Sequence, residues 1–210
     1  MIQKIYNAFL ECNQKITTDT RNVSIGCIFF ALKGPNFNGN RFANEALAKG
    51  ASYVVVDEKN DCEKNKTFVV NNVLQTLQDL ALFHRKKFKI PFIGITGTNG
   101  KTTTKELIGK VLSSKYNLLI TTGNLNNHIG VPLTILKLNK ENEIAVIEMG
   151  ASKKGDIKEL CEIALPTHGI ITNIGKAHLE GFGNAQIIKE TKLELYENII
   201  NRNGEIIVNK

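Results

Sequence analysis

The sequence has no tryptophan and only four cysteines and four prolines in 210 residues, and no apolar run approaches the length of a membrane span. The cysteines form no Cys-x-x-Cys pair, and their spacing fits neither a zinc site nor the disulfide framework of a small secreted domain. The first fifteen residues are too polar and broken for a signal peptide. These absences predict a cytoplasmic protein with reduced cysteines and no membrane insertion.

The charge is moderately basic, with 27 Lys and Arg against 20 Asp and Glu. Residues 1–90 hold 13 of the basic and 8 of the acidic residues. The basic residues are scattered and have no aromatic platform among them, which argues against a nucleic-acid partner. A phosphorylated small molecule as the ligand is a sufficient explanation for the surplus of basic residues. The alternative is that these residues only form a solvated surface.

The order of apolar and polar segments predicts two α/β domains, at residues 1–90 and 91–210. The first has an apolar strand at Cys27–Leu32, a helix at Arg41–Lys49 and a connector helix that begins at Val73. From Phe92 onward strands and helices alternate regularly. The expected strands are Phe92–Thr96, Leu118–Thr121, Ile144–Glu148, Gly169–Asn173 and Glu205–Val208, and the expected helices are Lys101–Ser114, Asp156–Ile163 and Ala185–Ile200. Near-continuous apolar strands between helices predict a mainly parallel sheet that is covered on both faces.

The strongest chemical signal is an apolar strand that runs into a glycine-containing loop, Lys-Thr and a helix. Backbone N–H groups of such a loop, together with the helix N-terminus, bind phosphate oxygens. The predicted nucleotide-binding residues are Gly97, Thr98, Asn99, Gly100, Lys101, Thr102 and Thr103. Lys101 is expected to reach the terminal phosphates and the Thr102 hydroxyl to bind Mg²⁺. The usual spacing requires a glycine where Ile95 stands, so a glycine-rich turn without a ligand is the alternative.

That departure in spacing is shared with a known family. Residues 95–104, Ile-Thr-Gly-Thr-Asn-Gly-Lys-Thr-Thr-Thr, resemble the phosphate loop of the Mur ligases and their folylpolyglutamate synthase relatives. Residues 18–34, which begin Thr-Asp-Thr-Arg, resemble the opening of the branches that add the third residue or the final dipeptide. The resemblance implies that Thr20 and Arg21 contact the UDP-sugar of the substrate. Read alone, Asp-Thr-Arg is typical of a turn or a helix cap.

Two further strings resemble the branch that adds D-alanyl-D-alanine. Residues 121–134 contain Gly-Asn-Leu-Asn-Asn-His-Ile-Gly-Val-Pro-Leu-Thr, with His128 where that branch has glutamate. The loop is rich in amides and follows a strand, so Asn126 and Asn127 are predicted to hydrogen-bond polar groups of the substrate. Residues 173–183, which contain Ala-His-Leu-Glu-Gly-Phe-Gly, resemble the same branch.

A metal site is expected at the carboxyl edge of the second sheet. Glu148 ends an apolar strand, where a buried carboxylate needs a partner or a metal and where α/β sheets bind ligands. A structural carboxylate is the alternative. The resemblance assigns Glu148 and His178 to a second Mg²⁺ and makes Lys192 a lysine carbamylated by CO₂, whose negative charge helps to hold that ion. Lys189 is the alternative if the match of this segment to the family is shifted along the sequence. A solvated lysine without a functional role is the other interpretation. His178 and Lys192 join Lys101 as the expected catalytic residues.

The resemblance implies an N-terminal UDP-sugar-binding domain followed by a P-loop ATPase domain. It implies a ligase that uses ATP and Mg²⁺ to join D-alanyl-D-alanine to UDP-N-acetylmuramoyl-tripeptide, in the synthesis of the peptidoglycan precursor. The family has a third, Rossmann-like domain that receives the dipeptide, and we expect it outside these residues. Since residues 205–210 read as a sheet strand, the chain is expected to be a fragment that is not competent alone, with a separate C-terminal half as the partner that would complete it. The alternatives are the ligase that adds the third amino acid and a non-catalytic nucleotide- or UDP-sugar-binding module.

Overall fold

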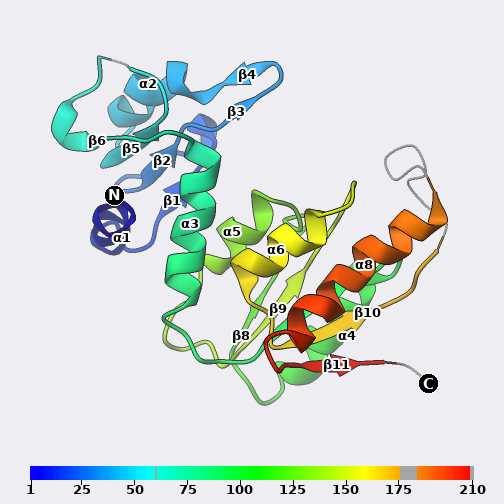
Figure 1. The fold of residues 1–210 in the computed structure, drawn as a ribbon. Coiled ribbons are helices and arrows are strands. Elements are labelled where there is room, and N and C mark those ends of the chain that lie inside the picture. The colour runs from blue at the N-terminus through cyan, green and yellow to red at the C-terminus, as the bar shows by residue number, and fades with distance from the viewer. Residues whose placement is uncertain (60, 176–183, 209–210) are drawn as a thin grey trace. The chain divides into compact units, whose positions relative to one another are not determined.

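A computed structural model describes residues 1–59, 61–175 and 184–208. The chain divides into two compact units, Met1–Leu80 and Ala81–Lys210 (Figure 1). This boundary precedes the predicted one between residues 90 and 91, because the end of helix α3 (Val73–Arg85) is bonded into the second unit. His84 Nε2 lies 2.9 Å from the Leu138 carbonyl oxygen, and Arg85 Nε donates to the Ala164 carbonyl at 2.7 Å.

The first unit is built on a parallel sheet with strand order β1-β2-β5-β6, beside a two-stranded antiparallel hairpin of β3 and β4. Its strands are β1 (Ile16–Thr17), β2 (Ile28–Phe30), β3 (Lys33–Gly34), β4 (Phe37–Asn38), β5 (Tyr53–Val56) and β6 (Thr67–Val69). Its helices are α1 (Ile2–Glu11) and α2 (Ala43–Ala48), with short 3₁₀ turns at Thr20–Asn22, Gly39–Phe42 and Lys64–Lys66. Helix α3 begins in this unit.

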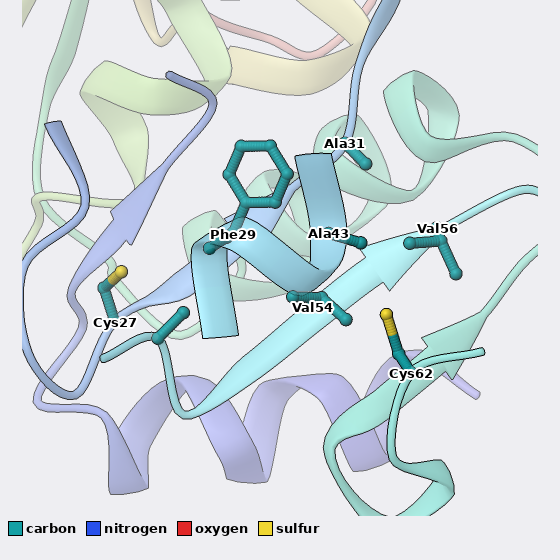
Figure 2. Packing of buried hydrophobic residues seen from close by; sticks show 9 residues of the cluster. Cys27, Phe29, Ala31, Ala43, Val54, Val56 and Cys62 are labelled. Carbon is teal, nitrogen blue, oxygen red and sulfur yellow. The ribbon is translucent and has the colours of Figure 1, made fainter. Parts of the chain in front are cut away.

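Alternation along β2 and β5 creates the core of the first unit. Cys27, Phe29 and Ala31 point to one side of the sheet, where they pack with Val54 and Val56 (Figure 2). The residues between them, such as Ile28, Phe30 and Val55, are also fully buried, so both faces of this sheet are covered. That double coverage explains why its strands read as continuous apolar runs. All four cysteines are free, as predicted, and all four are buried.

The second unit carries five parallel strands in the order β11-β10-β7-β9-β8 within its described residues. The strands are β7 (Phe92–Thr96), β8 (Leu118–Ile120), β9 (Ile144–Glu148), β10 (His168–Ile171) and β11 (Glu205–Ile207). The helices are α4 (Lys101–Leu112), α5 (Gly130–Ile135), α6 (Asp156–Ala164) and α8 (Ala185–Ile200). The mainly parallel α/β fold predicted from the sequence is confirmed.

Helices cover both faces of this second sheet. In Figure 1, α6 and α8 lie side by side on one face, and α4 lies on the other. The connection from β7 leads to β8 and the connection from β9 leads to β10, so the chain departs in opposite directions from the two neighbouring strands β7 and β9. Such a switch point opens a crevice at the carboxyl ends of the strands, which is where α/β proteins bind ligands. No helix in the described ranges is long and apolar enough to cross a membrane.

Candidate nucleotide-binding site

The phosphate loop, residues Gly97–Gly100, joins the carboxyl end of β7 to the first residue of α4. Both of its glycines have backbone angles that other residues rarely adopt, with φ of +150° at Gly97 and +77° at Gly100. A side chain at Gly97 would in addition overlap the Thr172 hydroxyl. The glycines therefore let the backbone turn sharply from the strand and place the helix N-terminus at the carboxyl edge of the sheet.

The segment after β10 fixes the shape of this loop. Asn173 accepts two loop N–H groups, that of Thr98 on its carbonyl at 3.1 Å and that of Asn99 on its Oδ1 at 2.9 Å. The Thr172 hydroxyl donates to the Asn99 carbonyl at 2.6 Å, and the Gly175 N–H donates to Thr98 Oγ1 at 2.9 Å. Sequence reasoning missed Thr172 and Asn173, although both follow a strand that pairs directly with β7.

The Lys101 side chain folds back over the phosphate loop. Its Nζ donates to the carbonyl oxygens of Gly97 at 2.8 Å and Thr98 at 3.1 Å. Burial lowers the pKa of Lys101, and the nearby Glu148 carboxylate opposes that shift. A cation is thus held directly above the loop that the sequence predicts to bind phosphate.

Glu148 is the focal carboxylate of the site and is only 2% exposed. Its Oε2 accepts the Thr102 hydroxyl at 3.0 Å, and its Oε1 accepts the Asn126 amide at 2.8 Å. Its backbone N–H donates to Thr121 Oγ1 at 3.0 Å. The structure therefore brings together Thr102, Glu148 and Asn126, which the sequence singled out separately, and it adds Thr121.

The two asparagines of the loop after β8 differ in their environment. Asn126 lies against Gly150, where a Cβ atom would come within 2.9 Å of Asn126 Oδ1. The Gly150 N–H also donates to the Asn126 carbonyl at 2.7 Å. Asn127 Oδ1 accepts the N–H groups of Ile129 and Gly130 at 3.0 and 2.9 Å, at the entry to helix α5. Asn126 is thus fixed beside Glu148, whereas Asn127 Oδ1 is committed to the backbone.

A cavity of about 390 Å³ opens beside the phosphate loop and Lys101. Lys192 enters it from α8 and is 3% exposed. Burial, reinforced by the positive charge of Lys101, lowers the pKa of Lys192 to about 8. Asp156 and Glu159 of α6 also line the cavity. The lining is Gly97, Thr98, Lys101, Asn126, Asn127, His128, Gly150, Ala151, Ser152, Asp156, Glu159, Leu160, Ile188 and Lys192.

The residues predicted to bind the UDP-sugar lie in the first unit. Asp19 caps the short helix Thr20–Asn22 by accepting the Arg21 N–H at 2.9 Å, and the exposed Arg21 guanidinium pairs with the same carboxylate at 2.7 Å. The Arg21 hydrogen bonds lower the pKa of Asp19 to about 2. Locally this segment is a cap, which the sequence allowed as an alternative, and its role in binding stays a prediction. His178 lies outside the described residues.

The donor set around Glu148 fits a hard cation. Magnesium prefers oxygen ligands and is commonly held by one or two carboxylates together with substrate phosphates. Thr102 Oγ1 and Glu148 Oε2 are two oxygens already in contact at the edge of the phosphate loop. In the part of the chain that the structure describes, no three His, Cys, Asp or Glu side chains gather as a metal site. The phosphates of a bound nucleotide would supply further oxygen ligands to a cation at this position.

Comparison with known proteins agrees with this geometry. Residues 95–210 match the Mur ligase middle domain, and residues 14–98 match a domain described as "Mur ligase family, catalytic domain". The chain belongs to the Mur ligase family. This membership confirms the resemblance on which the sequence predictions rest.

Several relatives are similar over nearly the whole chain. The UDP-N-acetylmuramoyl-tripeptide–D-alanyl-D-alanine ligases of Bacillus subtilis and Synechocystis are each 42% identical to it, over 86% and 92% of its length. The Escherichia coli enzyme of the same name is 38% identical over 92% of the chain. The match spans only 40–44% of these relatives.

Solved structures give the same result. MurF from Acinetobacter baumannii superimposes with a TM-score of 0.87 at 39% identity, covering 92% of this chain and 43% of that one. MurF ligase from Thermotoga maritima, solved in complex with ADP, has a TM-score of 0.82 at 38% identity and covers 89% and 44%. A UDP-N-acetylmuramoyl-L-alanyl-D-glutamate–2,6-diaminopimelate ligase, at 20% identity and a TM-score of 0.56, shares the fold alone.

Proposed function

We propose that residues 1–210 are the substrate-anchoring and ATP-binding part of a ligase that joins D-alanyl-D-alanine to UDP-N-acetylmuramoyl-tripeptide in the synthesis of the peptidoglycan precursor. The observation that carries the proposal is the pairing of Thr102, on the helix after the phosphate loop, with the buried carboxylate of Glu148 at the next strand end. The names of the relatives favour this branch over the one that adds the third amino acid. Those relatives are more than twice as long as the match, so the complete reaction is proposed to need segments that residues 1–210 do not cover.

In this proposal the phosphate loop binds the phosphates of ATP. The N-terminus of α4 directs backbone N–H groups at anionic oxygens, and Lys101 exchanges its two carbonyl bonds for bonds to the phosphates. Phosphoryl transfer depends mainly on positioning and on stabilising charge. Lys101 supplies a positive charge from a partly buried position, where an electrostatic interaction is stronger than in bulk solvent.

Thr102 and Glu148 would hold Mg²⁺, which supplies positive charge opposite the transferred phosphoryl group when it is bound. Glu148 is oriented for this role from three sides by Thr102, Asn126 and Thr121. Glu148, the imidazole of His178 and the carbamate of Lys192 are proposed to hold a second cation. A depressed pKa favours carbamylation, since CO₂ reacts with the neutral amine, and the pKa of Lys192 is lowered to about 8 by burial.

The substrate carboxylate is proposed to enter the cavity beside the phosphate loop, where Asn126 and Asn127 hydrogen-bond its polar groups. The UDP-sugar end is assigned to Thr20 and Arg21 in the first unit. Attack by the substrate carboxylate on the terminal phosphate yields an acyl-phosphate and ADP, and the amine of D-alanyl-D-alanine then displaces phosphate. We place the reaction in the cytoplasm, because ATP is the co-substrate and all four cysteines are free.

The proposal is tested by product formation. The full-length protein that carries residues 1–210 is incubated with UDP-N-acetylmuramoyl-tripeptide, ATP, Mg²⁺ and D-alanyl-D-alanine, and pentapeptide and phosphate are measured by mass spectrometry and colorimetry. We expect pentapeptide, its loss in Lys101→Met, and its retention in Lys110→Met, which changes an exposed lysine on the same helix. Residues 1–210 alone are expected to bind ATP without forming pentapeptide.

Two outcomes would favour the alternatives. A product formed only from UDP-N-acetylmuramoyl-dipeptide and a free diamino acid would identify the branch that adds the third residue. Nucleotide binding without ATP consumption, for either pair of substrates, would identify a non-catalytic module.

A further inference from the structure

Helix α4 buries a second lysine that the proposed chemistry does not use. Lys105 is 1% exposed. Its Nζ donates to the Thr121 carbonyl at 2.7 Å and lies 2.8 Å from Oε1 of Glu106, whose side chain is 67% exposed. Burying an ammonium costs free energy that an apolar side chain of similar length would not incur.

Lys105 belongs to a set of linked residues around Glu148, here called the Glu148 ring and made of Thr102, Lys105, Thr121, Asn126 and Glu148. Thr102 and Lys105 lie three residues apart on α4, a spacing that places them on neighbouring positions of one helix face. Thr102 bonds the Glu148 carboxylate directly. Lys105 bonds the Thr121 carbonyl, and the Thr121 hydroxyl accepts the Glu148 N–H. Helix α4 thus holds Glu148 both by its carboxylate and, through Thr121, by its backbone.

The position of Thr121 explains why such a bond would matter. Thr121 directly follows β8, which pairs with β9 and lies at the edge of the sheet formed by the described residues. The end of an edge strand has a neighbouring strand on one side only, so it is less constrained than the ends of the central strands. The Asn126 loop begins at this same point. The Lys105 ammonium, on α4, donates a hydrogen bond to the Thr121 carbonyl. This bond restrains the backbone at Thr121, as a second neighbouring strand would otherwise do.

We propose that Lys105 is a positioning residue, which acts through Thr121 to hold Glu148 in the orientation needed by a divalent cation bound with the nucleotide. The inference rests on the proposed function, because it presumes that Glu148 serves a nucleotide-bound cation. It predicts a specific defect. Loss of Lys105 lowers the gain in ATP affinity that Mg²⁺ confers and leaves the affinity for metal-free ATP nearly unchanged.

The experiment measures ATP affinity by isothermal titration calorimetry, once with Mg²⁺ and once with EDTA, and takes the ratio of the two. Outer-shell partners of metal ligands typically contribute about 10- to 100-fold to metal affinity, so Lys105→Met should lower the ratio by about tenfold or more. The affinity for metal-free ATP should stay within about twofold, and Lys110→Met should leave the ratio unchanged. A merely structural loss would alter urea unfolding and both affinities together, not their ratio.

A second variant covers the case in which Lys105→Met does not fold. Thr121→Val removes the hydroxyl that accepts the Glu148 N–H while nearly preserving shape, and Thr121→Ser retains it. Thr121→Val should lower the ratio and Thr121→Ser should not. If both single variants fold, the double variant should lose less than the sum of the two, since both act on one ring.

An unchanged ratio in folded Lys105→Met, or in Thr121→Val when the lysine variant is unfolded, overturns the inference while the proposed function stands. Absence of ATP binding by the unaltered chain overturns both. The two failures are therefore distinguishable.

Discussion

Gly97→Ala should damage the phosphate loop without changing its chemistry. At φ +150° a residue with a Cβ atom is strained, which costs about 1–3 kcal/mol. The added methyl also overlaps the Thr172 hydroxyl and displaces its 2.6 Å bond to the Asn99 carbonyl, a bond that contributes about 0.5–1.5 kcal/mol. The combined penalty is therefore about 1.5–4.5 kcal/mol.

Where this penalty appears depends on whether the loop relaxes. If the loop stays in place, the free energy of unfolding of the second unit decreases. If the loop shifts in the free protein, the strain returns when nucleotide binds, and affinity falls by between about tenfold and a thousandfold. Urea unfolding and calorimetric titration with MgATP together account for both cases.

Two variants serve as controls for Gly97→Ala. Adding Thr172→Ala removes the clashing hydroxyl but leaves the backbone strain, so the double variant should recover part of the loss. Gly34→Ala lies in the first unit, where a Cβ atom meets no neighbour within 4 Å, and should bind ATP normally. Unchanged stability together with affinity within twofold of the unaltered chain in Gly97→Ala would refute this description of the loop.

Three further expectations concern charged groups. The pKa of Asp19, measured by carboxyl ¹³C NMR, should be about 2 because Arg21 donates hydrogen bonds to its carboxylate, and Arg21→Gln should raise that pKa toward 3.8. Any stabilisation from this pair is present above pH 3.8 and is lost as the pH falls toward 2. In CO₂-free buffer, Lys192→Met should be more stable than the unaltered chain below pH 8. That advantage should shrink as the pH rises from 8 toward 10.5, because burial lowers the pKa of Lys192 to about 8, and a constant difference would contradict it. Arg85→Met removes a buried guanidinium that donates to the Ala164 and Leu165 carbonyls and stacks on Phe92. Urea unfolding should therefore show a free energy of unfolding lower by about 2–4 kcal/mol. Lys86→Met, at the exposed neighbouring position, should change it by less than about 0.5 kcal/mol.

The sequence predicted the elements that carry the site because their signals are local. Strands β7 and β9 are apolar runs that end at Gly97 and at the charged Glu148, and their observed bounds match the prediction. Helix α8 begins where Asn184 accepts the Ile187 N–H, a standard cap, and its bounds also match. The phosphate loop was recognisable for the same reason, since strand, glycines, Lys-Thr and helix are contiguous.

Among the residues that the structure describes, helices α1 and α5 were missed, for different reasons. Helix α1 buries Ile5, Tyr6 and Phe9 at helical spacing, a signal that was available in the sequence. Helix α5 begins at Gly130 and contains Pro132, two residues that usually argue against a helix. Proline is tolerated in a first turn, where no intrahelical N–H bond is lost. Asn127 Oδ1 also accepts the N–H groups of Ile129 and Gly130, at the entry to this helix.

The contacts that orient the site could not be read from the sequence. Asn173 reaches the phosphate loop only because β10 pairs with β7 in one particular register. Lys105 looks like an ordinary helical lysine until its burial and its bond to Thr121 are known. Such pairings depend on strand order and on helix rotation, which composition and periodicity leave undetermined.

The most direct test of the central claim is the affinity of residues 1–210 for MgATP, measured by calorimetry for the unaltered chain, Lys101→Met and Lys110→Met. If Lys101 binds the phosphates, its loss removes charge-assisted hydrogen bonds that contribute about 2 kcal/mol or more, and affinity falls by about 30-fold or more. The exposed Lys110→Met control keeps the affinity of the unaltered chain. Equal MgATP affinity in a folded Lys101→Met variant would contradict the assignment of the phosphate loop.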